Sequence, residues 1–163
     1  MDKKSDSPNT DFISAKLKLM EERCRKNRLS LTVQRRAILE NLSSRKDHPT
    51  ADQIYASIQD KVAGVSRTTV YRVLETFVQL GLAQKISNPE AKARFDADTS
   101  KHHHAACVAC EKVIDIDPCH LPDVDLSRVD LGGFEVFDCS VVAVGLCSEC
   151  RGSNNIYREV RYN

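Results

Sequence analysis

Two Cys-x-x-Cys pairs in the second half of the chain restrict its fold more than any other feature of the sequence. Cys107 and Cys110 form the first pair, Cys147 and Cys150 form the second, and 36 residues separate the two pairs. Two thiolates on one tight turn can bind the same tetrahedral ion, so two such pairs predict a closed, four-cysteine zinc site. Because the spacing exceeds that of an ordinary zinc ribbon, this site should tie distant ends of a sheet together. The alternative is four unrelated buried thiols.

Neither a membrane span nor a secretion signal is evident in the 163 residues. No apolar run approaches the roughly 18 to 20 residues that a helix needs to cross a bilayer, and Met1–Thr10 lacks the apolar segment of a signal peptide. We therefore expect a soluble, cytoplasmic protein. Cysteines seldom form disulfides in that reducing compartment, which favours metal binding by the cysteine pairs.

The charge of the chain is unevenly distributed, although its net charge is only +1. Residues 1–92 contain 17 Lys and Arg against 11 Asp and Glu, whereas residues 93–163 contain 7 against 12. The two parts therefore carry charges of +6 and −5. A basic first part indicates a polyanionic partner, and an acidic second part indicates an affinity for cations.

Helical periodicity extends through the first half of the chain as far as Gly81. Apolar residues recur on one helical face of Phe12–Arg28 and again on one face of Val33–Leu42. A third helix should begin at Thr50, where the sequence Thr-Ala-Asp-Gln has the form of a capping box. A fourth should follow Ser66 as its N-cap, with Gly81 in the left-handed position that ends a helix.

The hydrophobic period changes after Gly81 from that of a helix to that of a strand. Leu82–Ser87 and Lys92–Asp96 are predicted to be two short strands around a turn. Helices followed by such a hairpin are typical of a winged helix-turn-helix, which binds DNA. We assign residues 1–11 to a disordered tail and residues 12–96 to a winged-helix DNA-binding domain.

Residues 97–163 are predicted to form a second, metal-binding domain. Strand-like patterns at Lys112–Asp117 and Phe134–Val144 flank a segment rich in Pro and Asp, with room for a short helix. The chain is therefore of the α+β class, with an N-terminal winged helix-turn-helix domain followed by a C-terminal α/β domain.

The first turns of the predicted fourth helix carry a polar surface opposite its apolar stripe. The candidate DNA-binding residues on this surface are Ser66, Arg67, Thr68, Thr69, Tyr71 and Arg72. Arginine can pair with guanine in the major groove, and hydroxyl groups can reach phosphates or bases. The alternative is a solvated face of an amphipathic helix. The position of this helix, after other helices and before a hairpin, favours DNA binding.

A third group of side chains can bind a metal ion without sulfur. Its members are Asp96, His102, His104, Asp115 and, from the first half, His48. Because side chains alternate along a strand, His102 and His104 should point to one side and His103 to the other. A shell of imidazoles and carboxylates suits Fe(II) or Mn(II). The alternative is that these histidines are simply solvated.

The remaining cysteines and histidines carry no recognisable signature. We expect Cys24, Cys119 and Cys139 to be packed thiols rather than ligands, and His103 and His120 to lie on the surface. A thiol enzyme or a metal hydrolase is the weakest alternative, since no cysteine has the surroundings of a nucleophile and no general base is evident. The chain is therefore not expected to be an enzyme.

From about Arg28 to Cys150 the chain resembles the ferric uptake regulator family. The segments that carry this resemblance are Leu31–Leu39 (LTVQRRAIL), His48–Tyr55 (HPTADQIY), Val65–Leu74 (VSRTTVYRVL), Arg94–Asp96 (RFD), His102–Cys110 (HHHAACVAC) and Cys147–Cys150 (CSEC). The resemblance implies a homodimer that represses transcription from operator DNA, with residues 97–163 as its dimerisation domain. It also implies structural zinc on the four cysteines and regulatory Fe(II) or Mn(II) held by His48, Asp96, His102, His104 and Asp115.

Three positions refine what the resemblance implies. Asp115 makes the chain most similar to the peroxide-stress branch, whose Fe(II) form senses hydrogen peroxide by oxidation of ligand histidines. Many members bind a further metal ion through a histidine and a carboxylate, where this chain has Cys139 and Pro122. We expect that further site to be absent or altered. The alternatives are an iron-uptake or manganese-responsive regulator without peroxide sensing and, from another class, a zinc-ribbon interaction module.

Overall fold

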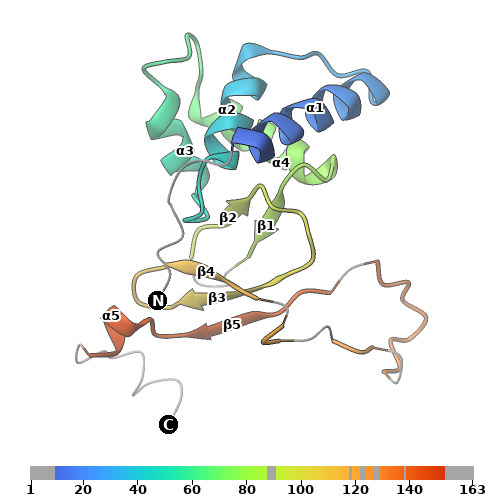
Figure 1. Ribbon diagram of the computed structural model, residues 1–163, viewed down its shortest axis with the longest axis vertical. Helices are drawn as coiled ribbons and strands as arrows, with labels where there is room; N and C mark the ends of the chain where they lie inside the picture. Colours follow the sequence, from blue (N-terminus) through green and yellow to red (C-terminus); the bar gives the residue numbers. More distant parts are fainter. Residues whose placement is uncertain are drawn as a thin grey trace. The chain divides into compact units, whose positions relative to one another are not determined.

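The computed structural model describes residues 10–87, 91–117, 119–121, 124–126, 129–137 and 139–152. The chain divides into two compact units, which are drawn in Figure 1. The first unit contains the described residues of Met1–Ser87 together with Lys92–Thr99. The second contains those of Asn88–Ala91 and Ser100–Asn163.

The first unit contains four helices: α1 (Thr10–Lys26), α2 (Val33–Ser43), α3 (Ala51–Ile58) and α4 (Arg67–Gln79). The hydroxyl of Thr50 accepts a hydrogen bond from the amide of Gln53, and the Gln53 side chain accepts one from the amide of Thr50, which completes the predicted capping box. The hydroxyl of Ser66 caps α4 in the same way by accepting from the amide of Thr69. Gly81 has a φ of +64°, as predicted for the residue that ends this helix.

The longest of these helices, α1, begins earlier than the sequence predicts. Thr10 and Asp11 already belong to it, so the prediction of a disordered tail is wrong for these two residues. Asp11 lies in the first turn, where a carboxylate interacts favourably with the helix dipole. Residues 1–9 lie outside the described residues. Among the described residues, no helix is long and apolar enough to cross a membrane.

The four helices enclose one hydrophobic core. Its fully buried members include Met20, Ile38, Leu39, Ile54, Val70, Leu74 and Phe77. Burial of each such aliphatic or aromatic side chain contributes about 1.5–3 kcal/mol, so this core is the main source of stability in the first unit. Tyr55 packs against the same core and remains partly exposed.

A two-stranded antiparallel sheet completes the first unit. Strand β1 (Gln84–Ile86) pairs with β2 (Arg94–Asp96), with Gln84 opposite Asp96. The turn predicted between them includes residues 88–90, which lie outside the described residues. Helices followed by this hairpin form the winged helix-turn-helix that the sequence predicts.

The second unit is built on a three-stranded sheet with the order β4-β3-β5. Strand β3 (His103–Cys107) is antiparallel to β4 (Val113–Ile116) and parallel to β5 (Val142–Gly145), and the short helix α5 (Ser148–Arg151) follows. The whole chain is therefore of the α+β class. The described residues between 117 and 130 contain no helix.

The strand predicted at Phe134–Val144 is shorter than expected. Pairing with β3 begins at the register His104–Val142, and β3 itself begins at His103. The carbonyl of Val141 still accepts a hydrogen bond from the amide of His104 at 3.0 Å, and residues 134–137 and 139–140 precede the part of the chain that pairs with β3. Phe134 and Phe137 are 83% and 88% exposed, which differs from the half-buried side chains of a sheet.

Candidate metal centres and nucleic-acid interface

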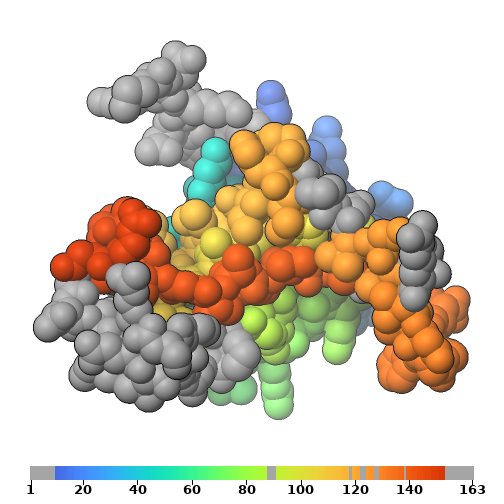
Figure 2. All heavy atoms as spheres, turned by 90° about the horizontal axis from the view of Figure 1, so that it is seen from below, coloured from blue at the N-terminus to red at the C-terminus, as the bar shows by residue number. Residues whose placement is uncertain are grey.

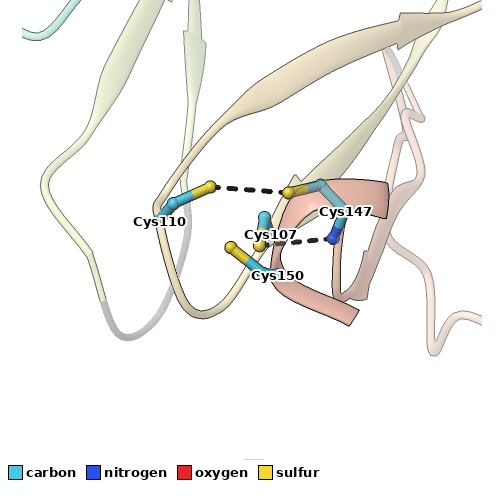
Figure 3. A group of neighbouring side chains, drawn as sticks. All are labelled: Cys107, Cys110, Cys147 and Cys150. Carbon is cyan, nitrogen blue, oxygen red and sulfur yellow. Dashed lines mark hydrogen bonds between the residues drawn. The ribbon is translucent and has the colours of Figure 1, made fainter. Parts of the chain in front are cut away.

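The four cysteines of the two Cys-x-x-Cys pairs come together at one end of the second unit's sheet. Cys107 ends β3, Cys110 lies in the turn before β4, Cys147 is the N-cap of α5, and Cys150 lies within α5. Their side chains point toward one another in Figure 3, and all four Sγ atoms lie within 4.8 Å of one another. The Sγ atoms of Cys110 and Cys147 are 3.7 Å apart. A tetrahedral zinc ion with Zn–S bonds of about 2.3 Å separates its sulfurs by about 3.8 Å. The cluster therefore fits zinc.

The electrostatics of this cluster favour a bound cation. Burial disfavours the thiolate of Cys107, but backbone amides, including that of Cys147 at 3.4 Å, outweigh this effect and lower its pKa to about 6. The neighbouring thiols of Cys147 and Cys110 raise the pKa of Cys150 to about 12. One thiolate thus forms readily, while a full set of four needs the positive charge of a metal ion.

Within the first unit, His48 and Asp96 form one set of oxygen and nitrogen donors. Nε2 of His48 lies 3.5 Å from Oδ2 of Asp96. His48 has a φ of +49°, an unfavourable conformation for a residue that precedes proline. Its carbonyl accepts a hydrogen bond from Arg94, and the carbonyl of Pro49 accepts one from Phe95, so β2 holds this backbone beside Asp96.

Within the second unit, His102, His104 and Asp115 form another set. The Nε2 atoms of the two histidines lie 3.5 Å and 3.7 Å from Oδ1 of Asp115. This proximity follows from the sheet, because His104 lies directly opposite Asp115 in the pairing of β3 with β4. Nδ1 of His102 lies 2.9 Å from the carbonyl of Ser100. That bond places the proton on Nδ1, so Nε2 presents the lone pair that could bind a metal ion.

His103 points away from this set, as strand alternation predicts. It accepts a hydrogen bond at Nδ1 from the amide of Val141, 3.2 Å away. It is also 1% exposed, so the prediction that it lies on the surface is wrong. Its partner Val141 lies just before β5, 38 residues later in the chain, a contact that local sequence patterns do not predict.

The predicted DNA-binding residues lie on the N-terminal turns of α4. Ser66, Arg67, Thr68, Tyr71 and Arg72 are exposed and Thr69 is partly exposed, whereas Val70 is buried. The hydroxyl groups of Ser66 and Thr69 lie 2.9 Å apart, so both take part in the helix cap. Tyr71 and Arg72 extend this exposed surface along the helix.

Asp52 links α4 to the segment that leads into β2, a contact that the sequence analysis missed. Its carboxylate oxygens lie 3.1 Å from Nη1 of Arg67 and 2.7 Å from Nζ of Lys92. Hydrogen bonding to Lys92, and then the charges of Lys92 and Arg67, lower the pKa of Asp52. The guanidinium of Arg67 also lies 5.1 Å from the ring centre of Tyr55. Two cations are therefore held side by side at the start of α4.

The three cysteines outside the pairs have different surroundings. Cys24 is fully buried, as predicted, and Cys139 is partly buried. Cys119 is exposed, so the prediction of a packed thiol is wrong. It lies beside Asp117 and His120, which are also exposed. The exposure of His120 confirms its predicted surface position. Pro122, on which the expected loss of a further metal site depends, lies outside the described residues.

Comparison with known proteins places this architecture in context. The sequence profile described as "Ferric uptake regulator family" matches residues 26–144. The "Peroxide operon regulator" of Bacillus subtilis (strain 168) is 36% identical over 139 residues, which cover 85% of this chain and 96% of that protein. The Helicobacter pylori ferric uptake regulator superposes with a TM-score of 0.73 at 20% identity, covering 91% of this chain and 99% of that one. The Pseudomonas aeruginosa ferric uptake regulator, solved with manganese, has a TM-score of 0.62 at 29% identity and covers 78% of this chain and 97% of that one.

Proposed function

Because this chain belongs to the ferric uptake regulator family, we propose that it is a metal-dependent transcriptional repressor that binds operator DNA as a homodimer in the cytoplasm. The observation that carries this proposal is the exposed polar surface at the start of α4 in a winged helix-turn-helix, in a chain that also contains two sets of metal donors. We assign DNA binding to residues 12–96, and metal binding and dimerisation to residues 97–163. The proposal is tested by using the protein to capture genomic DNA fragments in the presence of Fe(II), in the presence of Mn(II) and without metal. Enrichment of specific fragments only in the presence of metal would support it.

A structural zinc ion is the proposed occupant of the four-cysteine cluster. The sulfur separation of 3.7 Å and the set of four thiolates support this assignment. Four protein ligands close the coordination shell of zinc, so no position remains for a substrate. This closure favours a structural role over that of a metal hydrolase.

The regulatory metal is proposed to take ligands from both units: His48 and Asp96 from the first, and His102, His104 and Asp115 from the second. Two donors in one unit and three in the other are each an incomplete shell for Fe(II) or Mn(II). Only five residues separate Asp96 from His102 along the chain, and the boundary between the units falls among them. An ion bound by both sets would restrain the DNA-binding domain and select the conformation that fits operator DNA. The manganese-containing Pseudomonas aeruginosa relative supports Mn(II) as one occupant.

Arg72→Ala should weaken operator binding by about 1–3 kcal/mol if Arg72 contacts a base, and it should leave thermal unfolding nearly unchanged because the side chain is exposed. Fluorescence anisotropy with operator and with random DNA measures both affinities. Arg25→Ala removes the same charge from an exposed position on α1 and is the matched control. It should affect operator and random DNA equally. If Arg72→Ala distinguished operator from random DNA as well as the wild type does, a base contact by Arg72 would be excluded.

Dimerisation is proposed to use the apolar surface of the second unit. Eight large apolar side chains of this unit are at least 36% exposed: Ile114, Val124, Val129, Leu131, Phe134, Val136, Phe137 and Val144. Strand β5 pairs only with β3 among the described residues, so its other edge is available for a second copy. Figure 2 shows the segment around β5, in orange-red, along the surface of this unit.

Val144→Lys should weaken the dimer at least about tenfold, because it places a charge in a desolvated interface. Analytical ultracentrifugation over a range of protein concentrations measures the change. Val33→Lys is the matched control, since Val33 is 77% exposed but lies at the start of α2 in the first unit. Equal dissociation constants for the two variants would place the interface elsewhere.

Peroxide sensing is the proposed signal. It is supported by the identity to the Bacillus subtilis peroxide operon regulator and by Asp115 in the donor set. The competing proposal is an iron-uptake or manganese-responsive regulator that uses the same ligands without peroxide chemistry. The response of the Fe(II) and Mn(II) forms to peroxide separates these two functions.

A further inference from the structure

We propose that Asp117, Cys119 and His120 form an additional zinc site on the surface of the second unit. None of these residues belongs to the four-cysteine cluster or to the His and Asp sets described above. All three residues lie on one turn, and zinc binding there does not depend on the proposed function.

The turn begins where β4 ends at Ile116. The amide of His120 donates to the carbonyl of Asp117 at 2.9 Å, and the amide of Leu121 donates to the same carbonyl at 3.4 Å. The amide of Cys119 donates to Oδ1 of the Asp117 side chain at 2.9 Å. These bonds close the turn and fix the carboxylate beside the residues that follow.

Three different donor types converge on this turn. Sγ of Cys119 lies 3.3 Å from Nδ1 of His120, and one ligand atom from each of the three residues lies within 4.8 Å of the others. All three side chains are exposed, so water can complete a four-coordinate shell. Three protein ligands and one open position are sufficient for a tetrahedral ion.

The donor chemistry selects the class of ion. Thiolate and imidazole ligands favour zinc over the harder ions Mg²⁺, Ca²⁺ and Mn²⁺. Zinc binding replaces the thiol proton of Cys119 with a Zn–S bond and releases that proton to solvent. The thiolate and the carboxylate together balance the two positive charges of the ion, while the imidazole stays neutral.

The same surroundings disfavour the alternative role of a reactive thiol. Hydrogen bonding to the Asp117 carboxylate, together with its negative charge, raises the pKa of Cys119. The thiol therefore remains protonated at neutral pH, and its reaction with oxidants is slow. A cation removes this penalty, because it interacts favourably with the thiolate and the carboxylate together.

Cobalt titration tests the site in the full-length protein whose four-cysteine cluster is already filled with zinc. The His and Asp sets contain no sulfur, so a thiolate-to-Co²⁺ charge-transfer band reports on binding at Cys119. We expect this band in the wild type and in Cys139→Ser, which removes a partly buried thiol of the same unit outside the cluster. We expect Cys119→Ser to lack it and His120→Asn to need at least tenfold more Co²⁺.

Zinc binding is then measured by calorimetry in buffers of different ionisation enthalpy. The wild type should bind one more zinc ion than Cys119→Ser and release one more proton with it. Circular dichroism and the content of tightly bound zinc verify that both variants remain folded. The proposal is overturned if Cys119→Ser binds as many ions as the wild type with the same affinity. It is also overturned if the charge-transfer band disappears in Cys139→Ser instead.

Discussion

Cys107→Ser should lose the tightly bound zinc ion, unfold the second unit and leave the protein monomeric. Removal of one ligand opens a site whose other three thiols then repel one another when they ionise. Binding of structural zinc to small domains supplies about 10–16 kcal/mol of apparent free energy, much of which is free energy of folding.

Within one chain, the described residues of the second unit provide little else to stabilise it. Among its described residues, the only buried apolar side chains are those of Ala106, Cys107 and Val113. The burial of three side chains of this size cannot offset the entropy of ordering a three-stranded sheet. The first unit has its own core and should remain folded in this variant, with α1 to α4 intact.

Elemental analysis, light scattering and circular dichroism measure the three effects of this substitution. Cys139→Ser is the matched control, because it removes a thiol of the same unit that belongs to neither zinc site and leaves the four-cysteine cluster complete. It should retain one tightly bound zinc ion per chain and the dimer. Full zinc content and intact dimers in Cys107→Ser would refute the structural zinc assignment.

Hydrogen peroxide should inactivate the Fe(II) form of the protein and spare the Mn(II) form. Bound Fe(II) supplies a redox reaction with peroxide that Mn(II) supplies far less readily. The imidazoles proposed to hold the ion are the nearest oxidisable groups, and we expect His48 and His102 to gain one oxygen atom. An oxidised imidazole binds metal poorly, so the restraint on the DNA-binding domain is lost. Operator affinity should then fall by about 100-fold or more, toward that of non-specific binding.

Mass spectrometry after stoichiometric peroxide, with fragmentation to separate His102 from its neighbours, locates the added oxygen. His103 is the internal control, because it points away from the proposed regulatory set and belongs to neither proposed metal site. Oxidation confined to cysteine, or equal oxidation with manganese, would contradict peroxide sensing. The protein would then be a plain iron- or manganese-responsive regulator.

Short sequence motifs were sufficient to predict where helices of the first unit begin and end. Thr50 and Ser66 cap α3 and α4 through hydrogen bonds to residues three positions ahead, so a short stretch of sequence is sufficient to place both helix starts. Gly81 ends α4 in the left-handed conformation that glycine adopts without strain. The same locality applies to each Cys-x-x-Cys pair, where two thiols meet across one turn.

Pairings between distant segments were decided only by the tertiary structure. His103 is buried and accepts a hydrogen bond from an amide 38 residues later, and Asp52 binds Lys92, which is 40 residues away in the chain. Composition and periodicity contain no information on such contacts, because the packing of helices and strands sets them. Cys119 and His120 are adjacent in the sequence, but the sequence did not predict the contact between their side chains either. Neighbours in sequence can point apart, and the hydrogen bonds that close the turn after β4 bring these two side chains together.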